Sequence, residues 1–173
     1  KTRYLDKVEI RAPSSKKVSI RVESDICNYL ADVKPDFVIN AAMAKLGAGS
    51  QLAYEVNYLG AVNLARAANA LGIPFIHISS AAVMPTGHSL REEETLPLSP
   101  RLNPYAKSKL MAELTLKRMA EQEGLDYSCI RLAIVYGAHD HKIQGFHRML
   151  EHFAALHPEI AHRAPRGPAV DPL

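Results

Sequence analysis

The sequence predicts an α/β fold built on a doubly wound parallel sheet. Apolar runs of strand length alternate with segments of helical period, which is the order expected when helices join parallel strands on both faces of a sheet. The chain is 47% hydrophobic over 173 residues, so it supplies a core for one domain without disulfide or metal support.

The N-terminal part is expected to form strands followed by a short helix. Residues 2–10 and 18–22 are rich in β-branched side chains, which favour strands. Ser24 or Asp25 then stands where it can cap a helix over 26–33, because short side-chain oxygens accept hydrogen bonds from the free backbone amides that begin a helix.

The middle of the chain is expected to alternate strand, helix and strand. Residues 37–40 are a short apolar run that ends in Asn, as a buried parallel strand can. Apolar residues recur at about helical period over 51–71, and Gly72 with Pro74 ends that helix. The largely apolar run at 75–78 is the next strand, and a pair of serines follows it.

A loop rich in Pro and Glu, over 84–103, leads to another expected helix. Pro104 suits the start of a helix, the helix spans 105–122, and Gly124 ends it. Residues 127–136 are typical of one more strand.

The chain is expected to divide near residue 140. Residues 1–140 hold the alternating strands and helices, whereas 141–173 hold an amphipathic helix, over 143–156, and an irregular tail dense in Pro, His and Arg. The histidines of this last part follow no recognised ligand spacing, so no metal site is expected.

The composition disfavours several classes of partner. The 21 basic and 18 acidic residues are scattered without a dense basic block, so nucleic acid is not an expected partner. No apolar stretch approaches the roughly 20 residues that cross a bilayer, so no membrane association is expected. Cys27 and Cys129 are far apart in apolar runs and are expected to be buried and reduced, as in a cytoplasmic protein.

The clearest chemical signal is the pair Tyr105 and Lys109. The two residues are four positions apart on an expected helix, so their side chains leave the same face, one turn from each other. An ammonium beside a phenol favours the phenolate, and such a pair can exchange a proton with a substrate alcohol. The same spacing is also common on ordinary solvated helices, so the pair alone leaves both interpretations open.

Ser80 adds a hydroxyl at the carboxyl edge of the expected sheet, where open α/β folds place their ligand sites. That hydroxyl can hydrogen-bond a reacting oxygen. The alternative is that Ser79 and Ser80 are turn residues that cap the strand end, which is the interpretation favoured for Ser79. Asn57, on the helix over 51–71, is expected to fix the loop beside the site rather than to contact substrate.

Several segments together resemble one enzyme family. In chain order, they are Asn40-Ala41-Ala42 after a strand, Val56-Asn57-Tyr58-Leu59-Gly60 on a helix, Ile78-Ser79-Ser80-Ala81-Ala82-Val83 at a strand end, Pro104-Tyr105-Ala106-Lys107-Ser108-Lys109 at a helix start, and Arg131-Leu132-Ala133-Ile134-Val135-Tyr136-Gly137 on a strand. This succession is similar to that of the extended short-chain dehydrogenases/reductases, above all the NAD-dependent epimerase/dehydratase group that acts on nucleotide sugars. The resemblance covers roughly residues 1–140.

The resemblance implies a Rossmann-like NAD(P)-binding domain that passes hydride between a nucleotide sugar and a nicotinamide. It implies that Tyr105 is the acid/base, that Lys109 orients the nicotinamide ribose, and that Ser80 binds the reacting oxygen. Ala81 and Ala82 stand where sugar dehydratases of the family often have an Asp-Glu pair, which disfavours dehydration. The resemblance leaves a homodimer open as the assembly.

The cofactor implied by the resemblance is NAD, with NADP as the alternative. Asp6 corresponds to the acidic residue that binds the adenosine ribose and repels the extra phosphate of NADP. Asp25 and Ile26 resemble the acidic-apolar pair that contacts adenine, and Ala41 with Ala42 lies beside the cofactor. A surface turn for Asp6 and a helix cap for Asp25 are the alternatives.

One departure concerns the glycine-rich turn that holds the pyrophosphate. The family has such a turn, with its strand, before the position of Asp6, and this chain has none. We therefore expect a Rossmann-like domain incomplete at its N-terminus, followed by the start of a truncated substrate domain. A hydroxysteroid- or dihydroflavonol-type reductase and a noncatalytic binding module are the competing interpretations. The set of Ser80, Tyr105 and Lys109 argues against the noncatalytic module, and the absent turn argues for it.

Overall fold

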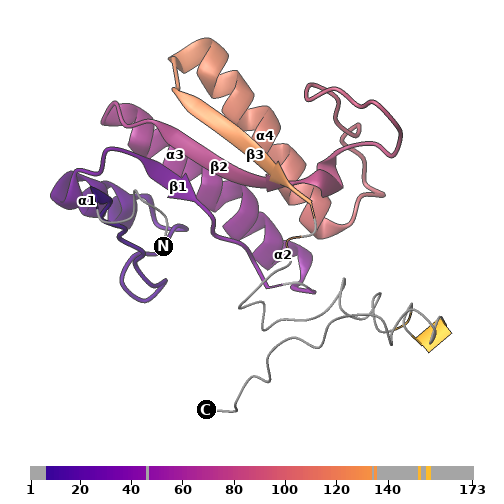
Figure 1. The fold of residues 1–173 in the computed structure, drawn as a ribbon. Helices are drawn as coiled ribbons and strands as arrows, with labels where there is room; N and C mark the ends of the chain where they lie inside the picture. Colours follow the sequence, from indigo (N-terminus) through magenta and orange to yellow (C-terminus); the bar gives the residue numbers. More distant parts are fainter. Residues whose placement is uncertain (1–6, 46, 134, 136–151, 153–154, 157–173) are drawn as a thin grey trace. The chain divides into compact units, whose positions relative to one another are not determined.

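The computed structural model describes residues 7–45, 47–133, 135, 152 and 155–156. The chain divides into two compact units, 1–133 and 134–173, and nearly all described residues belong to the first (Figure 1). The expected boundary at residue 140 lies outside the described residues and stays a prediction, as does most of the helix expected over 143–156.

A three-stranded parallel sheet forms the centre of the first unit, in the order β1-β2-β3 (Figure 1). The strands are β1 (Val38–Asn40), β2 (Phe75–Ser80) and β3 (Tyr127–Leu132). These strands begin within two residues of the expected positions, and their parallel pairing confirms the expected α/β architecture. The strand expected over 127–136 ends at Leu132 within the described residues.

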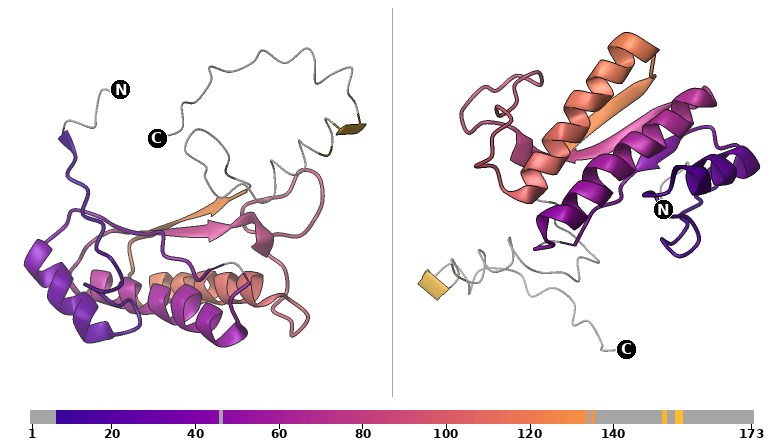
Figure 2. Two further views of the ribbon diagram at one scale, coloured as in Figure 1. Left: turned by 90° about the horizontal axis from the view of Figure 1, so that it is seen from below. Right: turned by 180° about the vertical axis from the view of Figure 1, so that it is seen from behind.

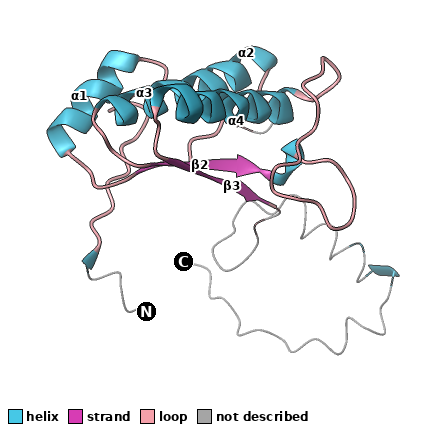
Figure 3. Ribbon diagram, turned by 90° about the horizontal axis from the view of Figure 1, so that it is seen from above, coloured by secondary structure: helices cyan, strands magenta, loops and turns pink. Residues whose placement is uncertain are grey.

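Most helices of the first unit lie together on one face of this sheet (Figures 2 and 3). They are α1 (Glu23–Val33), α2 (Ser50–Ala53), a π-helical segment (Tyr54–Leu59), α3 (Gly60–Ala70) and α4 (Pro104–Glu123), while a short 3-10 helix (Ala81–Val83) directly follows the carboxyl end of β2. Ile39, Ile130 and Leu132 are exposed on the strands. The second helical layer that a doubly wound sheet requires is therefore not among the described residues.

The N-terminal expectations are partly wrong. Residues 18–22 form a turn rather than a strand, and 7–10 form no strand. The β-branched side chains of the turn serve packing instead: Val18 is buried, and Ile20 lies so close to Gly60 that a Cβ there would come within 2.6 Å of it. Strand propensity largely reflects side-chain packing, which a turn against a helix can also satisfy.

The expected cap of the first helix is also wrong. Val22 occupies the cap position of α1 and makes no side-chain cap hydrogen bond, while Ser24 and Asp25 lie inside the first turn. Asp25 adds a negative charge near the N-terminus of the helix, which is favourable to the helix dipole.

The helix expected over 51–71 is present but divided. A π-helical segment over Tyr54–Leu59 separates α2 from α3. Such segments are rare and frequently mark functional sites. This one holds Asn57, which is almost fully buried.

Helix α4 begins and ends where the sequence predicts. The Asn103 side chain accepts a hydrogen bond from the Ala106 amide at 2.8 Å, and Pro104 occupies the first turn, where its missing amide hydrogen is not needed. Gly124 ends the helix with a φ of 71°, in the left-handed region that favours glycine.

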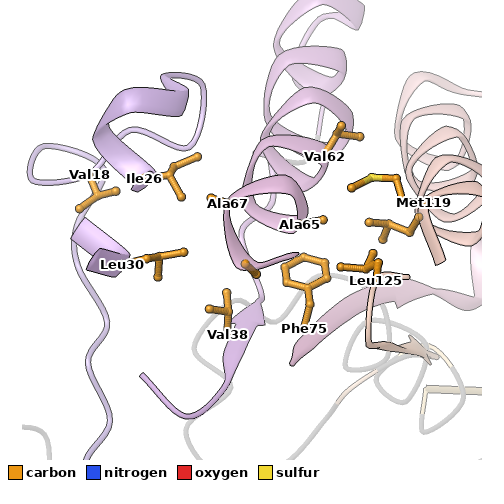
Figure 4. Close-up of a cluster of buried hydrophobic side chains, with 12 residues drawn as sticks. Val18, Ile26, Leu30, Val38, Val62, Ala65, Ala67, Phe75, Met119 and Leu125 are labelled. Atoms are coloured by element: carbon orange, nitrogen blue, oxygen red, sulfur yellow. The ribbon is translucent and has the colours of Figure 1, made fainter. Parts of the chain in front are cut away.

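The apolar core joins α1, α3 and α4 to the helix-covered face of the sheet (Figure 4). Phe75 of β2 belongs to the same buried cluster as Leu30, Val38 and Leu125. Cys27 and Cys129 are both exposed, so the expectation that they are buried is wrong. In α1 the helical period turns Ile26 and Leu30 inward, which leaves Cys27 outward.

Candidate active site

The carboxyl end of β2 carries the serine pair, and the two side chains have different surroundings. Ser80 is half-buried, and its hydroxyl accepts a hydrogen bond from the Ala82 amide at 3.2 Å, capping the 3-10 helix. Ser79 is buried and donates a hydrogen bond to the Glu113 carboxylate. The capping role favoured for Ser79 is therefore wrong, and Ser80 has it.

Helix α4 brings Lys109 against this strand. The Lys109 side chain is buried, with a residue exposure of 3%, and its ammonium donates to the Ile78 carbonyl oxygen at 2.8 Å. Ile78 is two residues before Ser80 on β2. Tyr105, one turn before Lys109, is half-buried. No hydrogen bond joins the side chains of Ser80, Tyr105 and Lys109 to one another in the described structure, so it brings Lys109 to the strand without linking all three.

The ammonium of Lys109 is held in a poorly solvated position. Burial lowers the pKa of Lys109 below its ordinary value, and the negative charge of Glu113 acts in the opposite direction. Glu113 is four residues after Lys109, on the same face of α4. Tyr105, Lys109 and Glu113 therefore form a single row along the helix.

Asn57 links two further parts of the site. Its side-chain oxygen accepts a hydrogen bond from the Ala44 amide at 2.8 Å, and its side-chain nitrogen donates to the Ser108 hydroxyl at 3.0 Å. That hydroxyl donates to the Tyr105 carbonyl oxygen at 2.9 Å. The chain after β1 is thus fixed to the first turns of α4, which confirms the loop-fixing role expected for Asn57.

Sequence reasoning missed the contacts that Arg131 of β3 makes. Its Nε and Nη2 donate to both oxygens of the Glu113 carboxylate at 2.8–3.1 Å. Its Nη1 donates to the carbonyl oxygens of Glu92 and Glu94 at 2.6 and 3.3 Å. A carboxylate one turn after Lys109 on the same helix face was the signal in the sequence, but only the fold pairs it with Arg131.

His77 lies at the centre of β2 and is fully buried. The Asn40 side chain is hydrogen-bonded to its Nδ1 at 3.2 Å, while Nε2 has no partner. Burial lowers the pKa of His77 to about 4, and the positive charge of Lys109 acts in the same direction. The imidazole is therefore neutral at pH 7. Asn40 also accepts a hydrogen bond from the Ala42 amide at 3.1 Å, which fixes the turn after β1.

The residues expected to hold the cofactor lie in different surroundings. Asp6 lies outside the described residues. Ala41 is exposed and Ala42 half-buried, and both directly follow the carboxyl end of β1. Ile26 is 1% exposed and packs in the core. Asp25 helps line an open hollow of about 350 Å³ beside α1.

No helix in the described ranges is both long enough and apolar enough to span a membrane.

A family model described as the NAD dependent epimerase/dehydratase family matches residues 3–160. The chain belongs to this family. The match covers most of the chain, including all the motifs that suggested the resemblance.

A curated relative agrees with this assignment. Over 123 residues, the chain is 32% identical to UDP-glucose 4-epimerase of Mycolicibacterium smegmatis, which corresponds to 67% of this chain and 39% of that protein. The chain therefore spans well under half the length of this member of the epimerase/dehydratase family.

Solved structures with similar folds support a Rossmann-like domain. UDP-glucose 4-epimerase of Thermus thermophilus, in complex with NAD, is 26% identical with a TM-score of 0.61, and the match covers 79% of this chain and 46% of that one. dTDP-4-dehydrorhamnose reductase of Yersinia enterocolitica is 20% identical with a TM-score of 0.69, and the match covers 88% of this chain and 54% of that one. This second likeness concerns the fold alone.

Proposed function

We propose that the chain carries the catalytic residues of a nucleotide-sugar epimerase that uses NAD, with NADP as the alternative cofactor. The observation that carries the proposal is the buried Lys109, whose ammonium meets β2 one turn along α4 from Tyr105. Core packing does not explain a buried lysine, because a charged side chain is rarely buried for packing alone. In a chain of the epimerase/dehydratase family, a lysine in this position has a chemical use.

Tyr105 acts as the general acid and base in this proposal. Its phenolate oxygen would take the proton from the sugar alcohol while the hydride leaves to the oxidised nicotinamide, and the resulting phenol would return the proton when the ketone is reduced. The ammonium of Lys109 stabilises the phenolate, and the Ser80 hydroxyl donates a hydrogen bond to the reacting oxygen. Since Ser80 already accepts from the Ala82 amide, its own hydrogen is free to be donated.

The described residues fit a nicotinamide cofactor at the carboxyl edge of the sheet. Ala41 and Ala42 follow β1 with short side chains, so they leave room for a ligand close to the backbone. We assign ribose contacts to Lys109 and further contacts to Asp6 and Asp25, but none to the Ile26 side chain, which is 1% exposed and packs in the core. A bound nicotinamide supplies the acceptor and donor of hydride.

The epimerase assignment, rather than dehydratase, has two supports. The 32% identical relative and the Thermus structure are both UDP-glucose 4-epimerases. In addition, Ala81 and Ala82 follow the active-site serine, and neither offers an acid or base to expel water.

The test is the Tyr105→Phe variant of a version of the chain extended at both ends by its flanking coding sequence. We expect turnover of a UDP-hexose to fall by about 100-fold or more, as the loss of a general acid/base should cause, with nearly unchanged affinity for NAD. Tyr54→Phe is the matched control, because Tyr54 is an exposed residue of the π-helical segment. Normal turnover by Tyr105→Phe would reject the mechanism.

A further inference from the structure

We propose that Arg131, held in place by Glu113, is a positioning residue that anchors the loop over 84–103 at the catalytic edge. This inference rests on the proposed function for its catalytic meaning, although the anchoring itself has an independent test. Neither residue is hydrogen-bonded to Ser80, Tyr105 or Lys109, so the positioning acts through the segments that they join. The charge of Glu113 acts on Lys109 as well, which is why Arg131→Lys is the primary test.

The loop over 84–103 connects the two catalytic elements directly. It begins after the 3-10 helix that follows Ser80, and it ends at Asn103, the cap of α4, two residues before Tyr105. The two ends of the loop are therefore continuous with the elements that carry the serine and the tyrosine.

Arg131 is the side chain that ties the middle of this loop to the sheet. Its Nη1 donates to the carbonyl oxygens of Glu92 and Glu94, while its other nitrogens are used by Glu113. Backbone bonds also join the loop to its flanking segments, from the Met84 amide to the Ala81 carbonyl, from the Leu96 amide to the Val83 carbonyl and from the Lys107 amide to the Asn103 carbonyl. Arg131 thus supplies the side-chain anchor that acts on the acidic stretch.

Glu113 fixes the orientation of the guanidinium. Its carboxylate accepts hydrogen bonds from Nε and Nη2, a fork that only a planar guanidinium can match. It also accepts the Ser79 hydroxyl, so one carboxylate joins α4, β3 and the strand residue next to Ser80. A buried pair of this kind is weak evidence for stability, but it can specify one arrangement of the segments that it connects.

Arg131→Lys removes the hydrogen bonds that anchor the loop but keeps the positive charge at this position. Lysine keeps a positive charge beside Glu113, so the carboxylate is not left unpaired in the interior, but a single ammonium cannot serve both Glu113 and the loop carbonyls. Arg21→Lys is the matched control, because Arg21 makes a single 2.8 Å ion pair with Glu55 and is half-exposed. Glu113→Gln and Glu55→Gln form a second matched pair that removes charge while it keeps shape.

The experiment measures native-state trypsin cleavage at Arg91 and Arg101, both exposed in the loop, by mass spectrometry, together with kcat and KM for a UDP-hexose. We expect Arg131→Lys to speed loop cleavage by several-fold and to lower kcat about tenfold, with KM for the UDP-hexose little changed. Glu113→Gln should act in the same direction, and both controls should match wild type.

Each result bears on one of the two proposals. Loop cleavage at the wild-type rate in both Arg131→Lys and Glu113→Gln overturns the anchoring, whether or not the protein is active. Faster cleavage with unchanged kcat overturns the positioning role. Faster cleavage together with normal turnover by Tyr105→Phe leaves the anchoring supported and overturns the proposed function instead.

Discussion

The α1 side and the α4 side of the described unit bury different kinds of side chain. On the α1 side, the helix packs through apolar residues such as Ile26 and Leu30, and its polar residues are exposed. On the α4 side, charged and polar groups such as Lys109 and Glu113 are buried together. Across the described ranges, every buried polar side chain belongs to β1, the π-helical segment, β2 or α4.

This difference indicates which side of the unit supports the fold and which side carries the chemistry. Burying a polar group costs free energy unless it is hydrogen-bonded, and apolar residues of similar volume would stabilise the α4 side at least as well. The α4 side nevertheless buries Lys109, Glu113 and His77, and the charges of Lys109 and Glu113 act on the other members of this group. We therefore interpret the α1 side as support and the α4 side as the part that acts on substrate.

Ile26→Ala should have the largest effect on stability and should mark the α1 side as apolar scaffold. The side chain is 1% exposed in the core, so its truncation should cost about 2–5 kcal/mol through lost transfer energy and a cavity. Urea denaturation measures this cost. Cys27→Ala, at the exposed neighbouring position, is the control and should change little. A cost for Ile26→Ala below about 1 kcal/mol would contradict the packing described.

The α4 side should respond to acid because His77 is buried as the neutral imidazole. The pKa is lowered from 6.5 to about 4, so the unfolded chain binds the proton first as the pH falls. Stability is thus fully present above about pH 6.5 and is lost as the pH falls toward 4, by up to about 3 kcal/mol.

Urea midpoints measured at intervals between pH 7 and pH 4 test this dependence. His77→Gln should reduce the slope, whereas His88→Gln, at an exposed position, should not. Equal slopes in wild type and His77→Gln would show that other groups carry the dependence.

Asn57→Ala should weaken the link between the chain after β1 and the first turns of α4. The variant removes the hydrogen bond that the Ala44 amide donates to Asn57 and the one that the Ser108 hydroxyl accepts from it. We expect a loss of about 1–3 kcal/mol, the cost of unsatisfied buried groups, with a lower turnover. Asn63→Ala is the comparison, because Asn63 makes one part-buried bond on the α1 side and should lose less. An equal loss in the two variants would contradict a special role for the π-helical segment.

Glu55→Gln should have the smallest effect. The Arg21–Glu55 pair is partly exposed, and solvent-exposed pairs of this kind contribute little to stability. The pKa of Glu55 is lowered mainly by its hydrogen bond from Arg21, so the small contribution is present above pH 4.5 and is lost below it. A loss of stability in thermal denaturation as large as that of Asn57→Ala would show that the α1 side also depends on ionic contacts.

The sequence was most informative where local signals coincide. The ends of α4 were predictable because Pro104 and Gly124 each have a local backbone reason to be there. The strand expected over 18–22 was wrong because its β-branched residues pack from a turn against Gly60, a tertiary effect. The π-helical segment has no signal in the apolar period.

The candidate site divides in the same way. Tyr105 and Lys109 were found from their spacing on one helix, which is local information. The bond from Ser79 to Glu113 and the fork from Arg131 to Glu113 join segments far apart in the chain, so only the fold reveals them. Whether Ser80, Tyr105 and Lys109 act on one substrate stays a prediction.

Substitution of two lysines on the same helix provides the most direct test of that prediction. Lys109 is buried against β2, whereas Lys107 is only partly buried, so Lys109→Met and Lys107→Met remove the same charge from different positions. NAD affinity and turnover of a UDP-hexose are measured for both variants of the extended protein. We expect Lys109→Met to weaken NAD binding and to cut turnover by about 100-fold, while Lys107→Met retains both. Wild-type binding and turnover in Lys109→Met would contradict the assignment of α4 as the catalytic helix.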